Sequence, residues 1–225
     1  MLKLYRRLCA SAAILAAFSA PQAQAAAVLT LDSPALTGLY FPGDSFTTNG
    51  YTLTVIGDAG IVDTADPVST TSPTGNSSQF YSQTNQGELV LKISYGGLFN
   101  LNGFDAAFIP LDPAAAGTSV MVAYATFANG SQGGVYWDFD ISLTSHFPFM
   151  TYDNPADFGF FTNVTQIEFF ACALVSGAVD CDPNTIQNNG QFAIDNISVV
   201  PEPGMGGLLA LCLAGLALTR RRATR

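Results

Sequence analysis

The chain has 225 residues, with 17 acidic and 8 basic side chains and a formal net charge of −9 at pH 7. Residues 26–200 hold sixteen of the acidic side chains, all but Glu202, and only one basic side chain, Lys92, so their formal charge is 1 − 16 = −15. Phosphate backbones and anionic lipids are bound by lysines and arginines that replace counterions. The composition therefore argues against nucleic acid and anionic lipid as partners, and it favours divalent cations and neutral or cationic polymers.

The first 25 residues have the three parts of a signal peptide. A basic stretch with Lys3, Arg6 and Arg7 precedes an apolar run over 8–18, and small residues follow at 23–25. Cleavage near Ala25 is predicted, because the apolar run is too short to span a membrane and the A-x-A ending is typical of signal peptidase sites. The protein is therefore expected to leave the cytoplasm through the general secretion machinery.

The domain that remains, residues 26–200, contains two of the four cysteines. Cys172 and Cys181 flank a short loop that contains a glycine. In an oxidising compartment such a pair is expected to form a disulfide, which would stabilise the fold by about 2 to 3 kcal/mol. A metal or redox role would require more ligands or a C-x-x-C motif, and the sequence has neither.

The C-terminal segment, residues 201–225, combines a proline-containing motif, an apolar stretch and a basic end. Residues 205–218 are apolar, and as a helix they would reach only about 21 Å, which is short of a bilayer core of about 30 Å. The positive-inside rule keeps the basic end in the cytoplasm and places the proline motif on the outer side of the inner membrane. The segment is predicted to be a short transmembrane helix that holds the protein transiently rather than a permanent anchor.

These three features, in this order at the end of the chain, resemble the PEP-CTERM sorting signal of Gram-negative bacteria. The matching residues are Val200, Pro201, Glu202 and Pro203, the apolar helix, and Arg220, Arg221 and Arg222. The resemblance implies that an exosortase, a membrane-embedded transpeptidase or protease, processes the segment. It also implies a host that makes extracellular polysaccharide and a final location at the cell surface or outside the cell.

Residues 26–200 show strand patterns throughout. Leu89, Leu91, Ile93 and Tyr95 alternate with polar or smaller side chains, which is the period of two expected for a strand with one wet face. Comparable runs lie at 27–32, 51–57, 101–109, 118–127, 135–141, 164–175 and 190–200. The sequence predicts an all-β domain, a single antiparallel β-sandwich of jelly-roll type with about eight to ten strands, and one long surface loop over 64–86.

The last predicted strand carries a second resemblance. Gln191, Phe192 and Asp195 match the motif of a PEP-CTERM subfamily named for QFxxD. Phe192 and Ile194 have one parity along the strand and Ile197 and Val199 the other, so both pairs can face the core only if a bulge lies at Asp195-Asn196. Such a bulge could turn Asp195 into a pocket, as a calcium ligand or as an acceptor of backbone hydrogen bonds.

Calcium is the one cofactor that the sequence suggests, and it would be structural. Besides Asp195, the run Asp180, Asp182 and Asn184 places three oxygen side chains at alternating positions, as a calcium loop does at its start. The run then departs from an EF-hand, and a polar hairpin tip beside a disulfide is the favoured alternative.

Sugar binding and catalysis are the remaining chemical candidates. Tyr136, Asp138 and Asp140 would share one outward face and offer an aromatic surface beside two acceptors, although an ordinary solvated strand face has the same composition. The single histidine, His146, excludes centres with several histidines, and no G-x-S-x-G or S-x-x-K motif is present. The sequence does not exclude a pair of catalytic carboxylates of the glycosidase type, because the separation of two carboxylates depends on the tertiary fold.

The leading hypothesis is a non-enzymatic, exosortase-sorted envelope or matrix protein associated with extracellular polysaccharide. A calcium-dependent carbohydrate-binding module is the alternative, and a glycoside-active enzyme is the second alternative.

Overall fold

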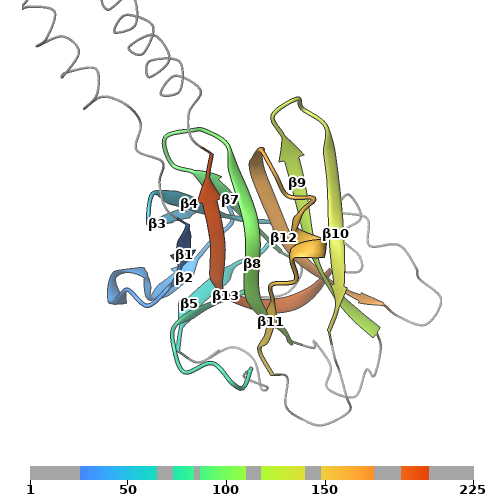
Figure 1. Ribbon diagram of the computed structural model, residues 1–225. Coiled ribbons are helices and arrows are strands. Elements are labelled where there is room, and N and C mark those ends of the chain that lie inside the picture. Colours follow the sequence, from blue (N-terminus) through green and yellow to red (C-terminus); the bar gives the residue numbers. More distant parts are fainter. Residues whose placement is uncertain are drawn as a thin grey trace, which may run out of the picture. The chain divides into compact units, whose positions relative to one another are not determined.

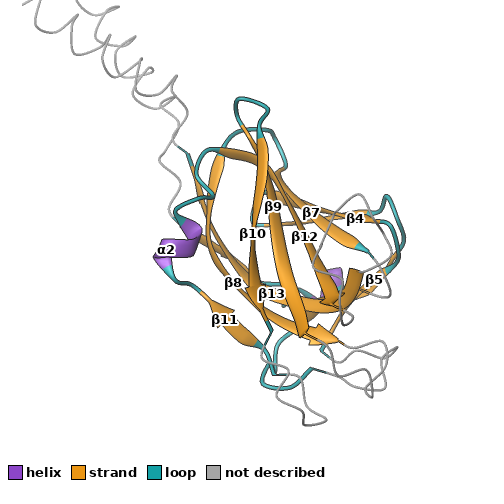
Figure 2. Ribbon diagram, turned by 90° about the vertical axis from the view of Figure 1, so that its right-hand side faces the viewer, coloured by secondary structure: helices purple, strands orange, loops and turns teal. Residues whose placement is uncertain are grey.

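The computed structural model describes residues 26–64, 73–83, 87–109, 118–139, 148–174 and 189–202. Ala26–Val200 form one compact unit that is almost entirely antiparallel β-sheet (Figures 1 and 2). The two short helices are the 3-10 turn Pro34–Leu36 and α2 (Pro155–Phe158). The strands are β1 (Ala27–Leu29), β2 (Gly38–Tyr40), β3 (Ser45–Thr48), β4 (Tyr51–Ile56), β5 (Gly60–Asp63), β6 (Phe80–Gln83), β7 (Glu88–Ile93), β8 (Phe99–Ile109), β9 (Thr118–Phe127), β10 (Gln132–Asp138), β11 (Met150–Tyr152), β12 (Val164–Leu174) and β13 (Asn189–Pro201).

The strands form two walls whose inner sides face the same core. Wall 1 contains β2, β5, β6, β13 and β8 in this order, with β1 on β13 and β11 on β8. Wall 2 contains β3, β4, β7, β12, β9 and β10. Only short ladders join the walls, because β12 pairs with β8 at Val164 and with β13 at Ala171 and Cys172. The sheet therefore closes almost completely around its core, as a sandwich or an incomplete barrel.

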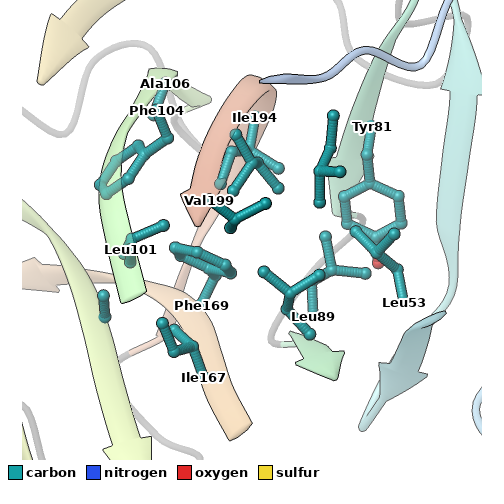
Figure 3. Packing of buried hydrophobic residues seen from close by; sticks show 14 of the residues in the cluster. Leu53, Tyr81, Leu89, Leu101, Phe104, Ala106, Ile167, Phe169, Ile194 and Val199 are labelled. Carbon is teal, nitrogen blue, oxygen red and sulfur yellow. The ribbon is translucent and has the colours of Figure 1, made fainter. Parts of the chain in front are cut away.

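Side chains from both walls meet in one hydrophobic core. Figure 3 shows residues of β6, β8 and β13 in wall 1 meeting residues of β4, β7 and β12 in wall 2 within this core. Phe104 lies at its aromatic centre, with ring centroids 5.2 to 5.8 Å from those of Trp137, Tyr152, Phe158 and Phe169. Edge-to-face contacts of this kind add to the area that the rings bury.

The fold confirms the predicted antiparallel sandwich and most of the long strands. Five strands were not predicted, namely β2, β3, β5, β6 and β11, and each has only three or four residues. The predicted loop over 64–86 is wrong in part, because Phe80–Gln83 form the buried strand β6 between β5 and β13. The predicted extension of this strand to Tyr95 is also wrong, because β7 ends at Ile93 and Tyr95 is 71% exposed.

Strand β13 contains the predicted change of side at Asp195-Asn196. Phe192 and Ile194 before it, and Ile197 and Val199 after it, all belong to the same core cluster although their parities differ. The backbone accommodates the extra residue of the bulge at Asn196, which has a positive φ of 49°. Asparagine tolerates this conformation better than most residues. The bulge is therefore confirmed.

Several predicted features lie outside the described residues. They are the signal peptide over 1–25, the apolar stretch over 205–218, and the arginines Arg220, Arg221 and Arg222. In the part of the chain that the structure describes, no helix is long and apolar enough to span a membrane. Export and sorting through these segments stay predictions.

Replacement of Phe104 by alanine should destabilise the domain strongly. The variant would leave a cavity among four rings, and a buried phenylalanine truncated in this way costs about 3 to 5 kcal/mol of unfolding free energy. Urea unfolding followed by tryptophan fluorescence measures the change. Phe41→Ala is the matched control, because Phe41 is 58% exposed and its loss should change the unfolding free energy by about 0.5 kcal/mol at most. Equal midpoints for the two variants would contradict the placement of Phe104.

Candidate functional site

The outer face of wall 2 brings together side chains from five strands. Successive side chains of a strand alternate between its two faces, so every second residue of β4, β7, β12, β9 and β10 points away from the core. The cross-strand register aligns Gly134 with Tyr124, Tyr124 with Glu168, Glu168 with Val90, and Val90 with Thr54. These aligned positions form one row across the five strands, and we call the surface around this row the outer face.

Two tyrosines occupy the β9–β10 side of the outer face. Tyr136 is 70% exposed and stands opposite Val122 on the neighbouring strand. Tyr124 lies over Gly134, where an added Cβ atom would come within 2.8 Å of the Tyr124 ring. Beside them, on the same face, lies an apolar cluster separate from the main core, formed by Val120, Val122, Phe170 and Cys172, against which Tyr124 packs. Both tyrosines therefore border this apolar cluster on the outer face.

A hollow adjoins the tyrosines on the β12, β7 and β4 side. It is lined by Thr54, Ile56, Glu88, Val90, Lys92, Gln166 and Glu168. The Gln166 Nε2 atom donates a hydrogen bond to Glu168 Oε1. Since Glu168 stands opposite Tyr124 on one side and Val90 on the other, the hollow continues directly from the aromatic surface.

The hollow holds two carboxylates whose charges interact. Partial burial raises the pKa of Glu88 above its ordinary value, and the neighbouring Glu168 carboxylate raises it further. Lys92 is the only basic side chain in the described part of the chain. The hollow is thus rich in hydrogen-bond acceptors and carries a negative charge that one ammonium group offsets only in part.

The structure places the predicted sugar-binding residues of β10 as the sequence indicated. Tyr136 and Asp138 are exposed, while Trp137 and Phe139 between and beyond them are buried in the core. Asp140 lies outside the described residues. The sequence reasoning missed Tyr124, Glu88, Gln166 and Glu168. The parity of Tyr124, Gln166 and Glu168 within predicted strands was available as a signal, whereas Glu88 precedes the strand that was predicted from Leu89. Their proximity was not predictable, because it depends on which strands pair.

A second polar site surrounds Asp195, whose side chain is fully buried. Its Oδ2 atom accepts a hydrogen bond from Asn76 Nδ2 at 2.9 Å and lies 2.8 Å from the Ser78 hydroxyl. That hydroxyl can donate its single proton either to Asp195 or to Asn76 Oδ1. The carboxylate therefore ties the segment after residue 73 to β13, at the bulge.

Only one of the two oxygen atoms of the Asp195 carboxylate, Oδ2, has side-chain hydrogen-bond partners among the described residues. Its Oδ1 atom is buried and has no hydrogen-bond partner among the described residues. Burial raises the pKa of Asp195, the hydrogen bonds from Asn76, Ser78 and the Asn196 backbone lower it, and the nearby Asp32 carboxylate raises it. Asp32 itself accepts a hydrogen bond from the Gln79 backbone N–H at 3.1 Å. A buried, partly unsatisfied carboxylate near a second one is an arrangement that a cation would stabilise.

The other metal and motif predictions have mixed outcomes. Asp180, Asp182 and Asn184 lie outside the described residues, and the described residues contain no group of three or more His, Cys, Asp or Glu side chains arranged for a metal. Phe192 of the QFxxD motif is a core residue, and Gln191 is half-buried beside it. Cys172 is disulfide-bonded, but Cys181 lies outside the described residues, so their pairing stays a prediction.

The start of the predicted sorting motif is part of the sheet. Strand β13 continues to Pro201, which is buried, and Val200 and Glu202 on either side are half-buried. Val199 stands opposite Ala27 in the ladder between β13 and β1. The two ends of the domain are therefore neighbours. Pro203 and the arginines of the motif lie outside the described residues.

No protein-family model and no curated protein matches this chain. Among solved structures, it is similar to a DUF4465 family protein from Bacteroides caccae, at 12% identity and a TM-score of 0.49, over 80% of this chain and 100% of that one. It is also similar to the CBM22-1 xylan-binding domain of Paenibacillus barcinonensis Xyn10C, at 10% identity and a TM-score of 0.35, over 80% and 97%. A third is TmCBM61 in complex with β-1,4-galactotriose, at 12% identity and a TM-score of 0.33, over 68% and 90%. These likenesses assign no activity to this chain.

Proposed function

We propose that the domain over 26–200 is a non-catalytic polysaccharide-binding module. The observation that carries this proposal is the outer face of wall 2, where exposed Tyr136 and the ring of Tyr124 adjoin a hollow lined by acceptors and an ammonium group. Sugar rings have apolar faces that pack on aromatic rings, and their hydroxyl groups need polar partners at the edge. The outer face offers both on a rigid sheet.

The paired carboxylates Glu88 and Glu168 favour one second candidate, a glycoside-active enzyme. They stand on adjacent strands in diagonal register, a geometry that separates the two residues by about 7 to 8 Å and their Cβ atoms by somewhat less. Glycosidases, however, use two carboxyl groups that flank the scissile bond. Glu88 and Glu168 project from the same face of one wall, so a sugar chain on that face would meet both from the same side. We therefore prefer binding without hydrolysis, and release of reducing ends from a bound polysaccharide would overturn this preference.

Replacement of Tyr136 by alanine should weaken polysaccharide binding about tenfold, because loss of a central aromatic contact typically costs at least about 1 to 2 kcal/mol. Affinity electrophoresis in gels containing the polysaccharide measures the change. Tyr95→Ala is the matched control, since Tyr95 is equally exposed at 71% but follows the end of β7 in a turn. Equal retardation of both variants would show that the tyrosine side of the outer face does not bind the chain.

Calcium at Asp195 is a further part of the proposal, supported by the buried and unpartnered Oδ1 atom and by the nearby Asp32 carboxylate. Calcium takes six to eight oxygen ligands, which carboxylates, amide oxygens, hydroxyls and water can supply. The ion would stabilise the bulge and the segment that Asn76 and Ser78 attach to it. It would act on the fold, at a site separate from the outer face.

The pH dependence of stability tests this calcium site. Without calcium, the raised pKa of Asp195 means that the folded state binds more protons than the unfolded state, so the unfolding free energy should fall as pH rises from about 4 through the folded pKa. Calcium binds the ionised form and should reverse this trend, adding about 2.7 kcal/mol at a concentration 100-fold above its Kd. Urea unfolding with EDTA or calcium at several pH values measures both effects.

Asp195→Asn should lose both the pH trend and the calcium effect relative to the wild type. Asp153→Asn is the control, because Asp153 is an exposed aspartate outside this cluster. A calcium effect of equal size in the Asp195 variant and the wild type would exclude this site.

Export and exosortase sorting complete the proposal, supported by the signal-peptide pattern over 1–25 and by the resemblance of 201–225 to a PEP-CTERM segment. The module would thereby reach the cell surface or the extracellular polysaccharide layer. Deletion of residues 201–225 should change both the cell fraction that contains the protein and the size of the mature protein, as judged by immunoblots of fractionated cells. Unchanged location and size would refute sorting through this segment, whatever the binding assays show.

A further inference from the structure

We propose that the outer face selects uncharged polysaccharide chains and rejects chains that carry uronate or sulfate groups. This inference rests on the proposed function and specifies its ligand class. It depends on three properties of the outer face: the charges around the hollow, the kind of hydrogen-bonding atoms that they present, and the direction of the row of aligned residues.

The charges around the outer face are mostly negative. Glu88 and Glu168 line the hollow together, and exposed Asp138 lies on the same strand as Tyr136. Lys92 is the single positive group, in a domain with a formal charge of −15 from 1 − 16. The two glutamates already repel each other, as the raised pKa of Glu88 indicates. A carboxylate or sulfate on a sugar would add a third negative charge to this group at close range.

The same carboxylates suit uncharged sugars. An ionised carboxylate only accepts hydrogen bonds, and sugar hydroxyls can donate them, so Glu88 and Glu168 would form charge-assisted bonds to a neutral chain. Gln166 and Lys92 supply N–H donors in the same hollow for hydroxyl or ring oxygens. The hydroxyls of Thr54 and Ser45, which lie 2.8 Å apart at the far end of the row, can serve as either donor or acceptor.

The row of aligned residues indicates an extended chain rather than a single sugar. Tyr124, Glu168, Val90 and Thr54 lie on four neighbouring strands in register, and Gly134 adds a fifth. Since adjacent strands are about 4.8 Å apart, this row is about 19 Å long. The Tyr124 ring and the Glu168 carboxylate lie side by side in the row, between Gly134 at one end and Val90 and Thr54 at the other, so several consecutive sugar units would contact the protein.

The test compares binding to uncharged and charged polysaccharides by affinity electrophoresis with the domain over 26–200 in EDTA and low salt. The uncharged probes are hydroxyethylcellulose, galactan and mixed-linkage β-glucan, and the charged probe is polygalacturonate. We expect the wild type to bind at least one uncharged probe at least tenfold more tightly than polygalacturonate. Because the rejection is electrostatic, the difference should shrink in high salt.

The variant Glu88→Gln/Glu168→Gln removes the two negative charges of the hollow and retains most of its shape. We expect it to bind polygalacturonate at least tenfold more tightly than the wild type does. The matched control Asp153→Asn/Asp157→Asn removes the same total charge just before and within α2, which contacts β8 of wall 1, and should leave the selectivity unchanged. Thermal unfolding in the same EDTA buffer checks that the wild type and both variants are folded.

Three outcomes would overturn the inference. Binding of polygalacturonate as tightly as the uncharged probes by the wild type would refute it and leave the proposed binding function standing. An equal gain in the hollow variant and its control would show that total charge rather than the outer face sets selectivity. Absence of binding to every probe by the wild type would refute the proposed function and the inference together.

Discussion

The bulge at Asp195-Asn196 is the constraint on which the rest of the domain depends. Strand β13 lies next to β6 on one stretch and next to β1 on another, and both stretches must present apolar side chains to the same core. If the side chains of β13 alternated strictly between its two faces, the apolar side chains of one stretch would point away from the core. The bulge keeps both inside, and it also places the buried Asp195 carboxylate where Asn76 and Ser78 can hold it. Core packing and the polar site are thus consequences of the same local irregularity.

The inner and outer sides of the two walls have different roles. Their inner sides form the core, whereas their outer sides differ in chemistry. Wall 1 has a small apolar cluster on its outer side, which includes Phe80, Ala107, Ile109 and Ala193. Wall 2 has the tyrosines and the charged hollow. Because the outer face is built on strands that the core holds rigid, its side chains can be positioned for a ligand without a loop that must order on binding.

The sequence was most informative where an alternation is long. Strands β8, β9, β12 and β13 have ten or more residues, enough to show a period of two, and the change of parity within β13 predicted its bulge. Strands β2 and β6 are too short to show a period. Tyr136 could be assigned to the outside from its own strand. The hydrogen bond between Asp195 and Asn76 could not be predicted, because these residues are 119 positions apart in the chain. The proximity of Glu88 and Glu168 could not be predicted either, because only the pairing of β7 with β12 brings them together.

The pairing of β1 with the end of β13 determines how the domain would respond to force. Ala27 and Val199 are partners, so the chain enters and leaves the domain side by side. A pull that separates these two ends loads the ladder one residue pair at a time, and each pair can open before the next one bears tension. A pull between the end of β13 and a chain held on wall 2 loads β13 along its length and shares the tension among many hydrogen bonds. A domain tethered at one end and loaded through its outer face would therefore resist unfolding better than the same domain stretched between its two ends.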